Sequence, residues 1–230
     1  MRNYCARRGL WIIVVWVWMF LGSFIAVVLT AYLVGTPLTL EMIISILNER
    51  PYLAVYGEIV GVGALPLIIS LLCNDSPRMY GLSKSGILIS LTLSVPPSLI
   101  ILLARLIHGV LRYESFNLSF PYNIWYAIIG VLAYGPLEVF FVIWLIVNTD
   151  YVLGSLDKIF SPGLIITVLA FGLSHIILSP KGGIFNAIEV TVIFLFLGLI
   201  FKYTRNSLGS MIAWTLINGQ VSSLLVGCLT

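Results

Sequence analysis

Residues 124–147 read IWYAIIGVLAYGPLEVFFVIWLIV, an apolar run in which Glu138 is the one charged residue. A charge at the centre of a membrane helix costs about 2.5–3.5 kcal/mol on insertion scales. Such residues usually face the interior of a helix bundle or a wet cavity, have a polar partner, and mark a functional site. We therefore expect the rest of the chain to pack around the stretch that holds Glu138.

Two later apolar segments supply polar residues that could be partners of Glu138. His175 ends the sequence FGLSH, and Asn218 ends the sequence WTLIN. Whether these three side chains meet decides most of what can be inferred about function.

The composition is that of an integral membrane protein. Hydrophobic residues make up 60% of the chain and charged residues only 9%, whereas soluble domains carry about 25% charged residues. The formal net charge of +3 is small and lies in expected loops, so we expect the lipid bilayer and no nucleic acid as a partner.

The apolar runs predict an all-α, polytopic transmembrane helical bundle of about seven spans, each of roughly 20 residues. The expected spans are residues 10–34, 51–73, 85–107, 122–147, 160–178, 184–201 and 208–229. Glu58 lies near one end of the second span, so we expect it to reach the membrane interface. Glu138 and His175 are each about 15 residues from the start of antiparallel helices, which predicts somewhat different depths.

The distribution of cations predicts the orientation. With the N-terminus in the cytoplasm, the cytoplasmic segments hold Arg2, Arg7, Arg8, Arg78, Lys84, Lys158, Lys202 and Arg205, and the external ones hold Arg50, Arg105, Arg112 and Lys181. This bias favours a cytoplasmic N-terminus. We expect the protein in the cell (plasma) membrane.

Glutamate, histidine and asparagine on three helices suit hydrolysis of a peptide bond. The glutamate acts as a general base on water, the histidine orients that water, and the asparagine N–H stabilises an oxyanion. The same residues equally suit a proton relay or a polar contact that holds three helices together. The chain has two histidines and no His-Glu-x-x-His sequence, so we expect neither a metal site nor another cofactor.

The order of these motifs resembles the CPBP family, which comprises the type II CAAX prenyl endopeptidases and bacteriocin-processing or immunity-related membrane proteins. The family pattern is Glu-Glu-x-x-x-Arg, then Phe-x-x-x-His, then a Phe-x-x-Gly helix, a short loop and His-x-x-x-Asn. Glu138 stands in the first motif and Phe171–His175 matches the second. Residues 194–210 resemble the segment before the last motif, and Gly81-Leu82 is also family-like.

The resemblance covers residues 78–220 and implies two parts of one integral membrane domain. These are the N-terminal transmembrane helices, residues 1–77, and a CPBP-like transmembrane core, residues 78–230. By this resemblance Glu138 is the base, His175 positions the water, and Asn218 with Trp214 holds the oxyanion.

The first motif departs from the family in one of two registers. If Glu138 is the first glutamate, Val139 and Ile143 replace a glutamate and an arginine that would pair at four-residue spacing. If Glu138 is the second, Leu137 and Val142 are the replacements. We prefer the first register, because the two charges are then lost together.

The last motif has Trp214 where the family has histidine. The indole N–H can donate a hydrogen bond to an oxyanion, but it cannot carry a proton. The alternative is a tryptophan that only packs against lipid or neighbouring helices.

Three functions remain open from the sequence. The first is a divergent CPBP-like intramembrane endopeptidase that cleaves a membrane-tethered, for example prenylated, peptide or protein. The second is a catalytically inactive relative that serves as a scaffold or binding subunit for membrane protein partners. The third, least favoured, is a proton-coupled transporter subunit that uses Glu58, Glu138 and His175.

Overall fold

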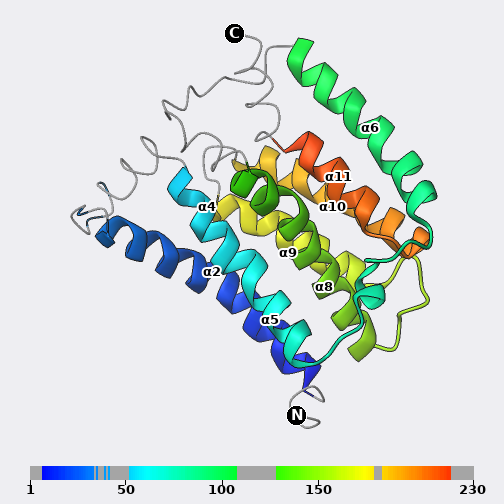
Figure 1. Cartoon of the computed structure of the whole chain (residues 1–230), viewed down its shortest axis with the longest axis horizontal. Helices are drawn as coiled ribbons and strands as arrows, with labels where there is room; N and C mark the ends of the chain where they lie inside the picture. Colours follow the sequence, from blue (N-terminus) through cyan, green and yellow to red (C-terminus); the bar gives the residue numbers. More distant parts are fainter. Residues whose placement is uncertain are drawn as a thin grey trace.

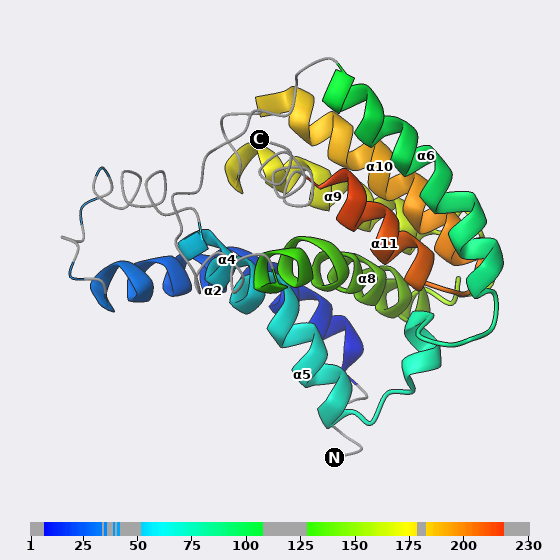
Figure 2. The ribbon, with the colours of Figure 1, turned by 45° about the horizontal axis from the view of Figure 1, so that its top comes forward.

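The computed structural model describes residues 7–33, 35, 39, 41, 52–107, 128–178 and 183–218. All regular structure in these residues is helical (Figures 1 and 2). Five described stretches are long and apolar enough to cross a membrane, namely Arg8–Leu33, Val55–Leu72, Ile87–Ile107, Ile128–Val152 and Gly183–Thr204. The predicted all-α fold is confirmed, and these helices indicate an integral membrane protein.

The elements run in the following order along the chain. They are α2 (Arg8–Leu33), α4 (Tyr52–Glu58), the π-helix η1 (Ile59–Ala64), α5 (Leu65–Leu72), the 3-10 helix η2 (Pro77–Tyr80), α6 (Ile87–Ile107), the π-helix η3 (Ala133–Leu137), α8 (Glu138–Val152), α9 (Pro162–Leu178), α10 (Gly183–Thr204) and α11 (Leu208–Ile217). The span limits expected at Val34, Pro51, Tyr122 and Leu229 lie outside the described residues.

Helix α8 is the centre of the fold. Twelve of its fifteen residues are buried, from Glu138 to Asp150, and it contacts α2, α9 and α11. A helix that is apolar on every side and buried on every side belongs to the core of a bundle. The stretch around Glu138 therefore has the central place that its sequence predicts.

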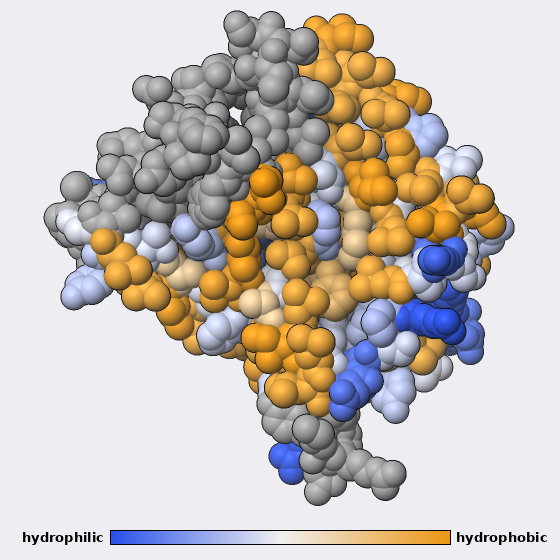
Figure 3. All heavy atoms as spheres, in the orientation of Figure 1, coloured by the Kyte–Doolittle hydropathy of each residue, from blue (hydrophilic) through white to orange (hydrophobic). Residues whose placement is uncertain are grey.

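The outer surface of the described helices is apolar. Large side chains such as Leu88, Leu71 and Phe185 are between 75% and 83% exposed. Figure 3 shows apolar residues over most of the visible described surface, with hydrophilic residues gathered toward the lower right, where Figure 1 places the connection between α5 and α6. Apolar side chains at this density fit contact with lipid and not with water.

Two expected loops are partly helix in the structure. Residues 148–158 were expected to form a polar loop, but α8 continues to Val152 with Asn148 and Asp150 fully buried. Lys202 was expected in a basic loop, but it lies inside α10 and is buried. The prediction from hydropathy ended these helices too early, because it treats Asp150 and Lys202 as separate charges that are exposed to water.

Asp150 and Lys202 form a buried ion pair that joins α8 to α10. The Lys202 ammonium lies 2.7 Å from Asp150 Oδ2 and also donates to the Leu156 carbonyl at 2.8 Å. The other oxygen, Asp150 Oδ1, accepts from the Ser155 hydroxyl at 2.7 Å and from the Gly163 backbone N–H at 2.9 Å. The carboxylate thus fixes the loop between α8 and α9 as well as the helix pair.

A second polar cluster lies at the N-terminal end of α2. The Arg8 guanidinium lies 2.6 Å from Asp75 Oδ1 and also donates to Asn148. The Tyr80 hydroxyl donates to Asp75 Oδ2 at 2.5 Å. These contacts join α2 and the turn after α5 to the buried end of α8.

The two family-like pieces around Gly81 and Asn206 are in direct contact. The Gly81 carbonyl accepts from the Ser207 backbone N–H at 3.1 Å, and the Asn206 amide donates to the carbonyls of Ser83 and Ser85. Gly81 has φ +74°, and a Cβ there would lie 2.6 Å from the Ser207 nitrogen. Only glycine permits both this conformation and this approach.

We expect Gly81→Ala to destabilise the protein by about 2–5 kcal/mol, because it adds a steric clash to the cost of a left-handed residue. Gly154→Ala is the matched control. Gly154 also has positive φ, +63°, but a Cβ there meets nothing within 4 Å, so its expected cost is about 1–2 kcal/mol. Denaturant unfolding of both purified variants measures the difference, and equal losses would contradict the account of the Gly81 contact.

Candidate functional site

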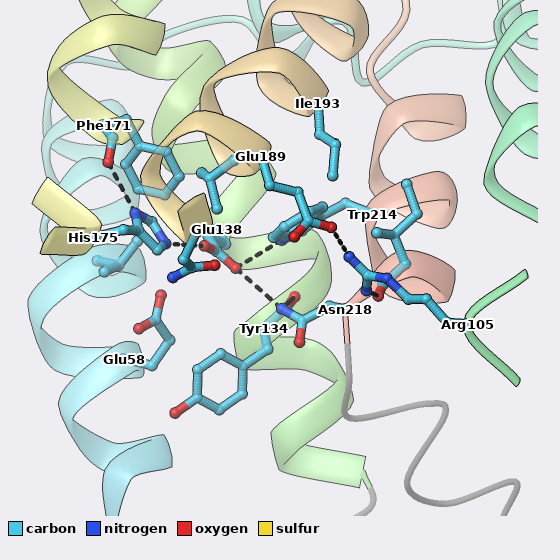
Figure 4. A pocket seen from close by; sticks show the side chains of 14 residues that line it. Glu58, Arg105, Tyr134, Glu138, Phe171, His175, Glu189, Ile193, Trp214 and Asn218 are labelled. Atoms are coloured by element: carbon cyan, nitrogen blue, oxygen red, sulfur yellow. Dashed lines mark hydrogen bonds and ion pairs between the residues drawn. The ribbon is translucent and has the colours of Figure 1, made fainter. Parts of the chain in front are cut away.

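Glu138, His175 and Asn218 line one cavity of about 350 Å³. The cavity lies where the ends of α4, α6, α9 and α11 meet the starts of α8 and α10. Its polar lining includes Glu58, Arg105, Glu138, His175, Glu189 and Asn218 (Figure 4). The three residues that the sequence singled out are therefore brought together, and Trp214 lines the same cavity.

A π-helical turn places Glu138 at the cavity. Pro136 lies inside η3 and lacks the N–H that a regular helix needs. Gly135 lets α11 approach closely, since a Cβ there would lie 2.2 Å from Thr215 Oγ1. Single π-helical turns inside helices occur frequently at functional sites. The Tyr-Gly-Pro sequence before Glu138 thus sets both the helix distortion and the contact with α11.

The Glu138 carboxylate is buried and its two oxygens have different neighbours. Oε2 accepts from the Trp214 indole N–H at 2.7 Å and lies 3.4 Å from the Asn218 amide nitrogen. Oε1 lies 3.8 Å from His175 Nε2, which is beyond hydrogen-bond range. One oxygen is therefore held by α11, and the other faces the histidine across a short gap.

The sequence predicted different depths for Glu138 and His175, and this prediction is wrong. The 3.8 Å separation puts them at one level. The expected end of the fourth span at residue 147 caused the error. Helix α8 continues to Val152, so Glu138 lies 14 residues before the end of α8 and His175 lies 13 residues after the start of α9. Helix ends are the least accurate feature of helices that are predicted from apolar segments.

The four-residue spacing between Phe171 and His175 has a clear physical role. His175 Nδ1 lies 2.9 Å from the Phe171 carbonyl oxygen, and the two rings pack edge to face at 4.9 Å. A carbonyl only accepts, so the proton is on Nδ1 and the Nε2 of the neutral ring is an acceptor. Nε2 is the nitrogen that faces Glu138.

A row of aromatic rings supports the site from the core. Phe171 packs against Phe194 with ring centroids 4.9 Å apart, and Phe194 packs against Trp214 at 4.7 Å. These rings fix the sides of α9, α10 and α11 that face the cavity. The phenylalanines of the family-like segments therefore hold His175 and Trp214 in place.

Asn218 connects α11 to the distorted turn. Its amide nitrogen donates to the Tyr134 carbonyl at 2.6 Å, within η3. Trp214 and Asn218 are one helical turn apart, so both reach Glu138 from the same face of α11. In the structure the Trp214 N–H is bonded to Glu138 itself.

Three further charged residues line the cavity. Glu58, which was expected at the interface and was a candidate only in the transporter alternative, lines the cavity with Glu138. Arg105 and Glu189 form an ion pair across the cavity wall, and Arg105 also donates to the Ile217 carbonyl at 2.6 Å. Their positions near helix ends gave no signal in the sequence, because polar groups near span ends are common.

No group of three or more histidine, cysteine, aspartate or glutamate side chains within the described ranges has a geometry that could hold a metal ion. Comparison of the chain with family models, with curated proteins and with solved structures found no match. Any functional assignment therefore rests on the geometry of the cavity and on the motifs quoted above.

Proposed function

We propose that the protein is a divergent CPBP-like intramembrane endopeptidase that hydrolyses a membrane-tethered peptide with water activated by Glu138. The main support for the proposal is that Glu138, His175 and Asn218 line the same cavity. They come from three different helices, and a protein with no chemistry to perform has no need to keep them together.

A water molecule beside Glu138 and His175 can bridge the two side chains. Oε1 and the neutral ring's Nε2 are both acceptors 3.8 Å apart, and two facing acceptors are stabilised by a shared donor. A water beside them, about 2.8 Å from each atom, can donate one hydrogen to each. Its lone pair then points away from both, toward a peptide carbonyl in the cavity.

The proposed reaction follows from this arrangement. Glu138 takes a proton from the water as its oxygen attacks the carbonyl carbon, and the proton then passes to the leaving amine. The Asn218 amide gives up its long contact to Glu138 Oε2 and supplies that N–H to the carbonyl oxygen as it becomes negative. His175 orients the water, and Trp214 acts as a positioning residue that holds Oε2.

The remaining features of the proposal concern the membrane. The five long helices together with the shorter α9 and α11 support about seven passages of the chain. The cytoplasmic N-terminus rests on the distribution of cations in the sequence, and the cell membrane is part of the proposal. Residues 78–230 form the CPBP-like core in this proposal. The substrate is a membrane-anchored peptide or protein, because the cavity lies among helices whose outer surfaces face lipid.

A comparison of peptide termini tests the proposal. Membranes are prepared from cells that express the wild type, Glu138→Gln or Asp157→Asn. The membrane proteins are digested to peptides, and protein termini that arise from cleavage in the cell are identified by mass spectrometry. Asp157 is fully exposed outside the cavity, so its variant is the control. We expect a set of termini shared by the wild type and Asp157→Asn and missing with Glu138→Gln. Identical termini in all three samples would contradict the proposal.

The contact between Trp214 and Glu138 favours a second candidate, an inactive scaffold or binding subunit for other membrane proteins. Trp214 occupies the family's histidine position and its N–H is used by the carboxylate. In that case the two residues form a structural contact between α8 and α11. Substitution of Trp214 separates the two candidates.

Under the endopeptidase proposal, Trp214→Phe is expected to lower the cleavage rate about tenfold or more, because Oε2 loses a charge-assisted hydrogen bond. Trp214→His keeps an N–H donor and restores the family's residue, so its rate is expected to stay well above that of Trp214→Phe. The measurement is the rate on one of the identified peptides beside the unfolding midpoint of each variant. If the cleavage rate of each variant falls only as its unfolding midpoint falls, the purely structural role of Trp214 is favoured.

A further inference from the structure

The cavity contains more negative than positive groups. Its lining has three carboxylates, Glu58, Glu138 and Glu189, but one guanidinium, Arg105. Glu189 is paired with Arg105, and Glu138 is bound by Trp214 and Asn218. Glu58 has no hydrogen bond or ion pair to any residue that the structure describes. One carboxylate in the cavity thus lacks a protein partner in this part of the chain.

The backbone around Glu58 is held firmly. The Gly57 carbonyl accepts from the Ser23 hydroxyl at 3.1 Å, and the Val60 carbonyl accepts from the Trp18 indole N–H at 2.8 Å. Gly61 lies against α2 so closely that a Cβ would lie 1.9 Å from Ser23 Oγ. Because α2 fixes the main chain on both sides of it, Glu58 keeps its place in the cavity wall.

Glu58 points toward the catalytic pair. Figure 4 shows its carboxyl group directed toward Glu138 and His175 from the opposite helix. The two glutamates line the same cavity. Two carboxylates that share an enclosed site favour a cation between or beside them.

We propose that Glu58 is a binding residue for a cationic group, the ammonium or guanidinium of a lysine or arginine side chain next to the bond that is cleaved. Cleavage of that bond rests on the proposed function, whereas binding of the cation does not. An organic cation fits better than a metal ion, because no described cluster has the geometry of a metal site. The cavity volume of about 350 Å³ admits such a side chain together with part of its backbone.

A pair of small probes of equal size tests this site without any cleavage. The full-length protein is placed in nanodiscs of zwitterionic lipid, and binding of 4-fluorobenzamidine, a cation, and 4-fluorobenzamide, its neutral analogue, is measured by fluorine NMR. Empty nanodiscs correct for partition into lipid. The wild type is expected to bind the amidine at least about tenfold more tightly than the amide, the ratio for one charge-assisted hydrogen bond.

Glu58→Gln is expected to remove this preference, whereas Asp157→Asn, which removes an exposed carboxylate outside the cavity, is expected to keep it. Equal affinities in the wild type, or a preference that survives in Glu58→Gln, would overturn the proposal. If Glu138→Gln loses the preference for the amidine and Glu58→Gln keeps it, the cation binds Glu138, and the proposal is overturned. If Glu58→Gln does not fold, Glu58→Ala replaces it, and a preference for the amidine that survives in this variant would again overturn the proposal.

The two proposals fail separately in these experiments. A protein that prefers the amidine through Glu58 but produces no new peptide termini refutes the endopeptidase and leaves the cation site. A protein that cleaves peptides through Glu138 but binds both probes equally refutes the cation site and leaves the endopeptidase.

Discussion

Glu138→Gln is expected to lower the rate of peptide cleavage by about a thousandfold. A positioned general base contributes about 10²–10⁴ to a rate, and the glutamine amide cannot take a proton from water. The change is nearly isosteric. The amide oxygen can still accept from the Trp214 N–H, and the amide N–H₂ can donate to His175 Nε2, so the fold is expected to persist. The measurement is the single-turnover rate on a peptide identified from the terminus comparison.

Two controls make this result interpretable. Asp157→Asn removes a carboxylate that is fully exposed, and its rate is expected to match that of the wild type. The unfolding midpoint of Glu138→Gln shows whether the variant is folded under the assay conditions. A folded Glu138→Gln protein with the wild-type rate would rule out Glu138 as the base.

Lys202→Met is expected to destabilise the protein by about 3–5 kcal/mol, the cost of leaving one member of a buried ion pair without its partner. The side chains of Lys202 and Asp150 are only 2% and 0% exposed. Removal of the ammonium leaves Asp150 Oδ2 without its charged donor at the junction of α8, α9 and α10. Denaturant unfolding of the detergent-solubilised protein measures the loss.

The double variant Asp150→Asn with Lys202→Met separates loss of the pair from loss of packing. It removes both charges, so we expect it to recover a large part of the stability that Lys202→Met alone loses. Arg205→Met is the surface control, because its pair with Asp157 is exposed and should contribute nothing measurable. A loss for Lys202→Met no larger than that for Arg205→Met would show that the buried pair does not stabilise the fold.

The sequence predicted the centre of the molecule because two strong signals coincide there. Glu138 is the one charge in a long apolar run, and apolar runs of this length have few alternatives to a membrane helix. His175 and Asn218 were found by the same reasoning, and the structure places both at Glu138. The backbone contact between Gly81 and Ser207 joins two of the segments quoted from the sequence.

The sequence did not predict which other charges are buried. Asp150 and Lys202 are 52 residues apart along the chain, and their pairing depends on how α8 and α10 pack, which hydropathy does not encode. Glu58 was placed at the interface for the same reason. A carboxylate a few residues from a helix end faces either water or a cavity, and only the neighbouring helices decide between them.

The most direct test of the account is cleavage in water enriched in oxygen-18. A membrane-tethered peptide from the terminus comparison is incubated with the purified, reconstituted wild type, and the fragments are analysed by mass spectrometry. We predict that oxygen-18 enters the newly formed C-terminal carboxylate with the wild type and that fragments are absent with Glu138→Gln. Absence of fragments with the wild type, or equal labelled cleavage with Glu138→Gln, would contradict hydrolysis by Glu138-activated water.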